Sequence, residues 1–106
     1  MDRIIIDVRE KFEYKIGHVK GAINLPPAKL MQGLPDELAD LPKDTEIVLY
    51  CLSGARSGAS IRILQQYGFT NLVNGINKDH VKAKYIAPSL NNLYDWSGNP
   101  VWVFTR

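Results

Sequence analysis

The sequence predicts an α/β domain of three layers, in which a central, mainly parallel sheet is flanked by helices. Residues 3–8 are a short run rich in β-branched residues and residues 47–50 are a short apolar run, the pattern of strands buried on both faces. Such runs alternate along the chain with short helical patterns, which indicates βαβ units. A length of 106 residues with 45% hydrophobic content suits one domain, residues 1–106, with a single core.

The first half of the chain is expected to form short elements whose boundaries are marked by turn residues. Residues 3–8 form the first strand, and residues 10–16 form a brief helix. Two prolines at 26–27 end the second strand, because proline cannot donate to the ladder of a central strand. The further elements expected here are a strand over 22–25 and helices over 28–31 and 36–39.

The second half is expected to place the longest helix between two strands. A strand over 46–50 leads through a loop into a helix over 57–67, which Gly68 terminates. A strand over 70–73 is then followed by a turn at residues 74–75, an Asn-Gly pair. The buried stripe of the helix is expected to comprise Ala59, Ile63 and Tyr67, widened by Ile61 and Leu64.

The last part of the chain has a looser pattern and is rich in aromatic residues, which are Tyr85, Tyr94, Trp96, Trp102 and Phe104. Residues 95–104 are compatible with a hairpin around a Gly-Asn turn, although Pro100 argues against a fully paired second strand. We expect an aromatic extension packed on the core as a flap. The alternative is an aromatic lid or docking surface near the cysteine.

Composition excludes several classes of partner. The net charge is +2, the basic residues are scattered and no apolar run reaches the length of a membrane span, so we expect no nucleic-acid and no membrane partner. One cysteine forms no internal disulfide, and Cys51 with His18 and His80 lacks metal-ligand spacing, so neither a metal nor a cofactor is expected. Met1 leads into a strand without a signal peptide, which favours the cytoplasm, or the periplasm if the chain is a processed product.

Cys51, the one cysteine, is the candidate nucleophile. It lies between the end of a predicted strand and the start of a predicted helix, where loop amides and the helix dipole stabilise a thiolate. Gly54 permits a tight turn, and Arg56 can pair with an oxyanion. The alternative is a buried, inert thiol. The loop expected to form an anion cradle around the sulfur comprises Leu52, Ser53, Gly54, Ala55, Arg56 and Ser57.

In order and spacing, three blocks resemble the rhodanese-like sulfurtransferases. They are IDVRE at 6–10, GHVKGAINLP at 17–26 and YCLSGARS at 50–57. The resemblance covers residues 1–76, and the chain is similar to the short, single-domain members of the phage-shock protein E type. Residues 77–106 are a divergent C-terminal segment. Members usually carry a second glycine where Asn74 stands and a tryptophan where Asp79 stands.

The resemblance implies that Cys51 takes the outer sulfur of thiosulfate or of a persulfide donor. The Cys51 persulfide would then pass this sulfur to cyanide or to a thiol acceptor, which a protein can supply. Arg56 would hold the sulfonate end of thiosulfate, or form an ordinary salt bridge. Asp7 and Arg9 are expected to form a structural pair, and His18 to support its turn through hydrogen bonds.

Two other functions remain open on the sequence alone. A cysteine-dependent phosphatase or arsenate reductase also uses a cysteine anion cradle, but its loop has five residues between cysteine and arginine. Here four residues separate Cys51 from Arg56, which tightens the ring of amides and favours a sulfur-sized group. A non-catalytic rhodanese-like module that binds a protein partner is the second alternative.

Overall fold

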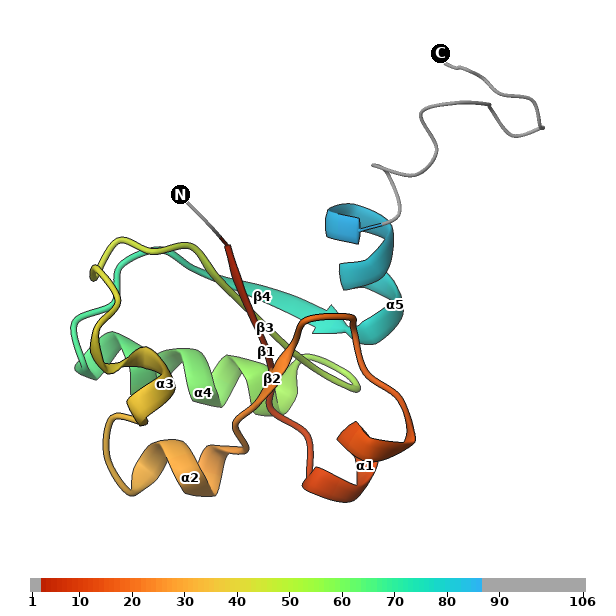
Figure 1. Ribbon diagram of the computed structural model, residues 1–106, viewed down its shortest axis with the longest axis horizontal. Coiled ribbons are helices and arrows are strands. Elements are labelled where there is room, and N and C mark those ends of the chain that lie inside the picture. The colour runs from red at the N-terminus through yellow and green to blue at the C-terminus, as the bar shows by residue number, and fades with distance from the viewer. Residues whose placement is uncertain (1–2, 87–106) are drawn as a thin grey trace, which may run out of the picture.

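The computed structural model describes residues 3–86 and confirms the predicted α/β architecture. A four-stranded sheet has the order β2-β1-β3-β4, and every adjacent pair is parallel (Figure 1). The strands are β1 (Ile4–Asp7), β2 (Ile23–Asn24), β3 (Ile47–Cys51) and β4 (Leu72–Asn77). The hairpin expected at 95–104, and the flap or lid it would form, lie outside the described residues.

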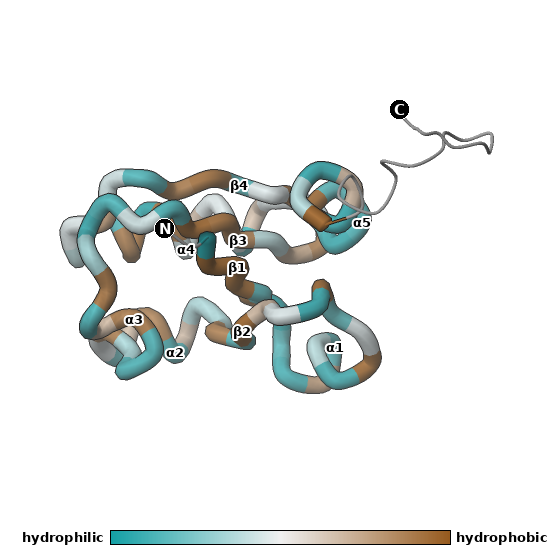
Figure 2. Tube along the Cα trace, turned by 45° about the horizontal axis from the view of Figure 1, so that its top comes forward, coloured by the Kyte–Doolittle hydropathy of each residue, from teal (hydrophilic) through white to brown (hydrophobic). Residues whose placement is uncertain are grey.

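Helices cover both faces of the sheet. One face packs against α2 (Pro27–Met31), α3 (Asp36–Ala39) and α4 (Ala55–Gln66), which bury Leu30, Leu38 and Leu64. The other face packs against α1 (Lys11–Ile16), α5 (Lys78–Val81) and a short π-helix, η1 (Lys82–Ile86). Hydrophobic residues accordingly run along β1, β3 and β4 between these layers (Figure 2). The sequence did not predict α5 or η1.

The strand predicted over 70–73 is present, but it runs over Leu72–Asn77, and the turn predicted at 74–75 was wrong. Residues 74 and 75 lie inside β4, where Leu49 pairs with Asn74 and Tyr50 pairs with Ile76, so Gly75 is an extra, bulged residue. The backbone of Ile76 takes a left-handed φ of 71°, and the Asn74 side chain accepts its N–H. Pairing with a buried neighbouring strand therefore overrides the local turn preference of Asn-Gly.

The predicted course of the long helix also needs correction. α4 begins at Ala55, two residues earlier than expected, so Arg56 belongs to its first turn. Its buried residues are Ser57, Ser60 and Leu64, whereas Ala59 is exposed. Two serines face the sheet because their hydroxyls have partners: the Ser60 hydroxyl, for example, donates to the Arg56 carbonyl at 2.9 Å.

We expect Gly75→Ala to destabilise the fold, because an added Cβ would lie 2.6 Å from Val81 Cγ2 and 2.9 Å from Val48 Cγ1. Overpacking of this kind costs about 1–3 kcal/mol of unfolding free energy, measurable by urea denaturation. Gly17→Ala is the control, since its Cβ would meet only the flexible end of Lys78 at 3.4 Å. Equal effects of the two substitutions would contradict this account.

Candidate active site

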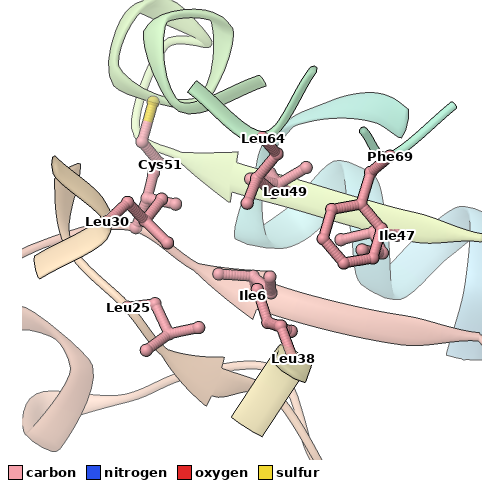
Figure 3. Packing of buried hydrophobic residues seen from close by; sticks show 10 residues of the cluster. Ile6, Leu25, Leu30, Leu38, Ile47, Leu49, Cys51, Leu64 and Phe69 are labelled. Atoms are coloured by element: carbon pink, nitrogen blue, oxygen red, sulfur yellow. The ribbon is translucent and has the colours of Figure 1, made fainter. Parts of the chain in front are cut away.

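Cys51 is the last residue of β3 and lies at the carboxyl edge of the parallel sheet, where α/β folds place their ligands. Its side chain is 1% exposed, and it belongs to the same buried cluster as Leu25 and Leu30. The sulfur points away from these leucines, toward the ribbon of α4 (Figure 3). The loop then turns sharply at Gly54, whose φ of 96° suits glycine, and the Gly54 N–H donates to Sγ at 3.1 Å.

Two opposing effects act on the thiol. Burial disfavours the thiolate and by itself raises the pKa of Cys51. Backbone N–H groups of Ser57, Ser53 and Gly54 favour the thiolate, and the Ser57 hydroxyl adds to them when it donates to the sulfur. The hydrogen bonds win and lower the pKa of Cys51 to about 7. A substantial fraction of the thiol is therefore ionised at neutral pH, in the form that reacts as a nucleophile.

Only some residues of the cradle loop provide hydrogen-bond donors to the sulfur. Amides of Ser53, Gly54 and Ser57 interact with Cys51, while the side chains of Leu52 and Ala55 are exposed. Ser57 is fully buried, with its Oγ 3.6 Å from Sγ. The predicted loop is thus a turn over 52–54 followed directly by the first turn of α4.

Arg56 is held by a residue that sequence reasoning did not select. Its Nη1 lies 2.9 Å from Oε1 of Glu13 on α1, and the pair is partly buried. This hydrogen bond lowers the pKa of Glu13 and raises that of Arg56, and the Cys51 thiolate also interacts favourably with the guanidinium. A separation of 43 residues left no local signal for this contact.

Asn74 is a second residue that the sequence marked only as a departure from the family pattern. Its Oδ1 accepts the Ser57 hydroxyl at 2.7 Å, and its Nδ2 donates to the Gly54 carbonyl at 3.0 Å. The side chain therefore joins β4 to the last residue of the turn, Gly54, and to Ser57 in the first turn of α4. The position of the Asn74 side chain depends on the bulge at Gly75. Because the sequence did not predict this bulge, it did not predict the contacts of Asn74 either.

Asp7 and Arg9 form a buried ion pair at the end of β1, with Arg9 Nη2 2.7 Å from Asp7 Oδ2. The Tyr50 hydroxyl donates to the same carboxylate at 2.7 Å and accepts the Val19 N–H at 3.0 Å. Arg9 also donates to the Gly17 carbonyl at 2.6 Å. This network joins β1, β3 and the loop after α1. Burial is the largest cause that raises the pKa of Tyr50, so its hydroxyl stays protonated and remains a donor.

His18 lies on that loop and interacts with α1. Its Nδ1 lies 2.8 Å from the Tyr14 carbonyl oxygen, and its ring stacks on the Tyr14 ring with centroids 3.7 Å apart. Among residues 3–86, no group of three or more His, Cys, Asp or Glu side chains is arranged to hold a metal ion. No helix in the same range is long and apolar enough to cross a membrane.

Tyr50→Phe should cost about 1–3 kcal/mol of unfolding free energy, because it leaves the buried Val19 N–H and one Asp7 oxygen short of a partner. Chemical denaturation measures this cost. Tyr67→Phe is the matched control, since the Tyr67 hydroxyl makes one partly buried bond to the Leu30 carbonyl and its loss should cost about 0.5–1.5 kcal/mol. A larger effect at Tyr67 than at Tyr50 would refute the importance of the network.

The ultraviolet absorbance of the thiolate, taken as wild type minus Cys51→Ser, should titrate with a midpoint near pH 7. Because the folded pKa lies below the ordinary value of a thiol, the unfolded chain binds more protons between the two values. The free energy of unfolding of the wild type should therefore rise with pH from about 7 to 9, relative to Cys51→Ser. A midpoint at the ordinary thiol value would show that the hydrogen bonds do not outweigh the effect of burial.

Comparisons with known proteins agree on the family. Residues 1–78 match the family model of the rhodanese-like domain. A sulfurtransferase of Allochromatium vinosum is 34% identical over 73 residues, which are 69% of this chain and 64% of that protein. A tRNA uridine(34) hydroxylase of Hamiltonella defensa is 36% identical over 73 residues, 67% of this chain but 21% of that protein. The chain thus spans less than two thirds of either relative.

A solved structure supports the same assignment. The structure of a rhodanese with anions from E. coli has a TM-score of 0.64 and 30% identity, and the match covers 74% of this chain and 91% of that one. The match to the family model includes β3 and the turn after Cys51. This chain belongs to the rhodanese-like domain family.

Proposed function

We propose that the protein is a sulfurtransferase that carries sulfane sulfur as a persulfide on Cys51. The observation that carries this proposal is the turn after β3, where the Gly54 N–H lies 3.1 Å from Sγ and the thiol has a pKa of about 7. Relatives named as sulfurtransferases support the class of reaction. The donor is thiosulfate or a persulfide, and the acceptor is a thiol of a small molecule or a protein.

In the first half-reaction the Cys51 thiolate attacks the outer sulfur of thiosulfate. A new S–S bond forms to Cys51, the S–S bond of thiosulfate breaks, and sulfite leaves with the electron pair of that bond. The product on the protein is a Cys51 persulfide anion. No general base is needed, because a substantial fraction of the thiol is already ionised near pH 7.

In the second half-reaction an acceptor thiolate attacks the outer sulfur of the Cys51 persulfide. The acceptor leaves as a persulfide, and Cys51 returns to the thiolate with the electrons of the broken bond. Thiolate and persulfide are both anions, so the same amides of Ser53, Gly54 and Ser57 favour each resting form. The free enzyme and the loaded enzyme can therefore share one cradle.

Because Arg56 is paired with Glu13, it is not free to bind the substrate as its only partner. Arg56 adds positive potential near the sulfur, but its guanidinium is already paired with Glu13 at 2.9 Å. Holding the sulfonate of thiosulfate would require the arginine to exchange or share this partner. The salt-bridge interpretation of Arg56 thus has more support than the substrate-clamp interpretation.

The same contact argues against a cysteine-dependent phosphatase or arsenate reductase. Such enzymes need an arginine free to bind a tetrahedral oxyanion, whereas Arg56 lies in the first turn of α4 and pairs with α1. A purely binding module gains nothing from an ionised thiol, so the low pKa of Cys51 favours chemistry over docking alone. Hydroxylation is not part of the proposal, since the chain matches only 21% of the hydroxylase.

Incubation of the reduced protein with thiosulfate should add the mass of one sulfur atom to the wild type and nothing to Cys51→Ser. Cyanide should remove the added sulfur and release thiocyanate. Tyr67→Phe serves as a control, because its hydroxyl bonds the Leu30 carbonyl on α2 and none of the groups that hydrogen-bond the thiol. Loading of Cys51→Ser would refute the assignment of the carrier, and loading of the wild type by other persulfides alone would exclude thiosulfate as the donor.

A further inference from the structure

The orientation of the Asn74 side-chain amide is determined by two backbone groups. The Ile76 N–H can only donate, and it lies 3.0 Å from Oδ1. The Gly54 carbonyl can only accept, and it lies 3.0 Å from Nδ2. Turning the amide over would set donor against donor and acceptor against acceptor at these two contacts. The oxygen of Asn74 must therefore face Ser57.

This orientation decides where the Ser57 proton goes. The hydroxyl has one proton, and its oxygen lies 2.7 Å from Asn74 Oδ1, an atom that can only accept. The proton therefore points to Asn74, and Ser57 Oγ turns a lone pair toward Cys51 Sγ, 3.6 Å away. In this arrangement the sulfur can donate to Ser57 as a thiol, and the hydroxyl bond that lowers the pKa of Cys51 forms only when Ser57 turns its proton from Asn74 to the sulfur.

We propose that Asn74 is a positioning residue that competes with the Cys51 thiolate for the hydroxyl proton of Ser57. When the thiol loses its proton to solvent, Ser57 gains a hydrogen bond to the sulfur only by giving up the one to Asn74. Asn74 thus restrains ionisation of the thiol while its Nδ2 holds the Gly54 carbonyl in the turn. The inference rests on the proposed function only in taking Cys51 as the sulfur carrier.

Other charges around the thiol do not replace this effect. Arg56 on α4 favours the thiolate, and Glu13 and Glu10 from the α1 segment interact with Arg56. The residue of α2 that lies in the same buried cluster as Cys51 is Leu30, which is apolar and carries no charge. None of these groups contacts Asn74 or the Ser57 hydroxyl through a hydrogen bond described in residues 3–86. Ser57 and Asn74 can therefore be varied while these charges are kept.

The test is a double-mutant cycle of Asn74→Ala and Ser57→Ala, with the Cys51 pKa read from the pH dependence of thiolate absorbance. Removing Asn74 frees the Ser57 proton for the sulfur but also loosens the Gly54 carbonyl. Loosening of the Gly54 carbonyl affects the Cys51 pKa whether or not the Ser57 hydroxyl is present. The difference between the pKa shifts caused by Asn74→Ala in the two backgrounds therefore isolates the competition for the Ser57 proton. We expect Asn74→Ala to lower the pKa by about 0.5–1 unit more when Ser57 is present than in the Ser57→Ala background.

A difference of zero, or one of opposite sign, would overturn the proposal. Asn77→Ala is the matched control on the same strand: its side chain accepts the His80 N–H at the start of α5, and its loss should leave the Cys51 pKa unchanged. Circular dichroism of each variant reports folding. The titration needs no sulfur donor, so its failure is distinct from a failure of sulfur loading.

Discussion

The buried ion pair of Asp7 and Arg9 is the constraint on which the placement of the Cys51 thiol depends. Asp7 is fully buried at the end of β1, and removal of one partner from such a pair typically costs about 3–5 kcal/mol. Tyr50 donates to the same carboxylate from β3, one residue before Cys51. Side-chain hydrogen bonds therefore hold the end of β3 against β1, in addition to the backbone hydrogen bonds between the two strands. This fixes the position of Cys51, where the turn begins.

Burial and hydrogen bonding have opposite effects on the pKa of Cys51. A fully apolar surrounding would keep Cys51 protonated, because desolvation penalises the charged form. The turn at Gly54 reverses this by aiming backbone N–H groups at the sulfur, and these donors are fixed before any substrate arrives. Ser57 can act on either side, since its one proton serves Asn74 or the sulfur. Reactivity is thus set by backbone geometry more than by any charged side chain.

Much of the fold could be predicted from the sequence because the two central strands, β1 and β3, are short and mainly apolar runs whose signal is local. The location of Cys51 followed in the same way, from a strand, a glycine turn and a helix in succession. What failed depends on contacts between distant segments. Asn74 and Gly75 have the composition of a turn, yet the neighbouring strand draws them into the sheet. Glu13 reaches Arg56 across 43 residues, a contact that no periodicity contains.

The ionised state of Cys51 also has a redox consequence. A thiolate near neutral pH is open to oxidation by peroxides, and the first product, a sulfenic acid, normally condenses with a second cysteine. The 106 residues of this sequence hold no second cysteine, so no thiol within them can condense with an oxidised Cys51. A side chain that is 1% exposed slows the approach of the oxidant but slows the reductant as well. For the proposed sulfur transfer, a thiol from outside these residues would then be needed to return Cys51 to its reduced form.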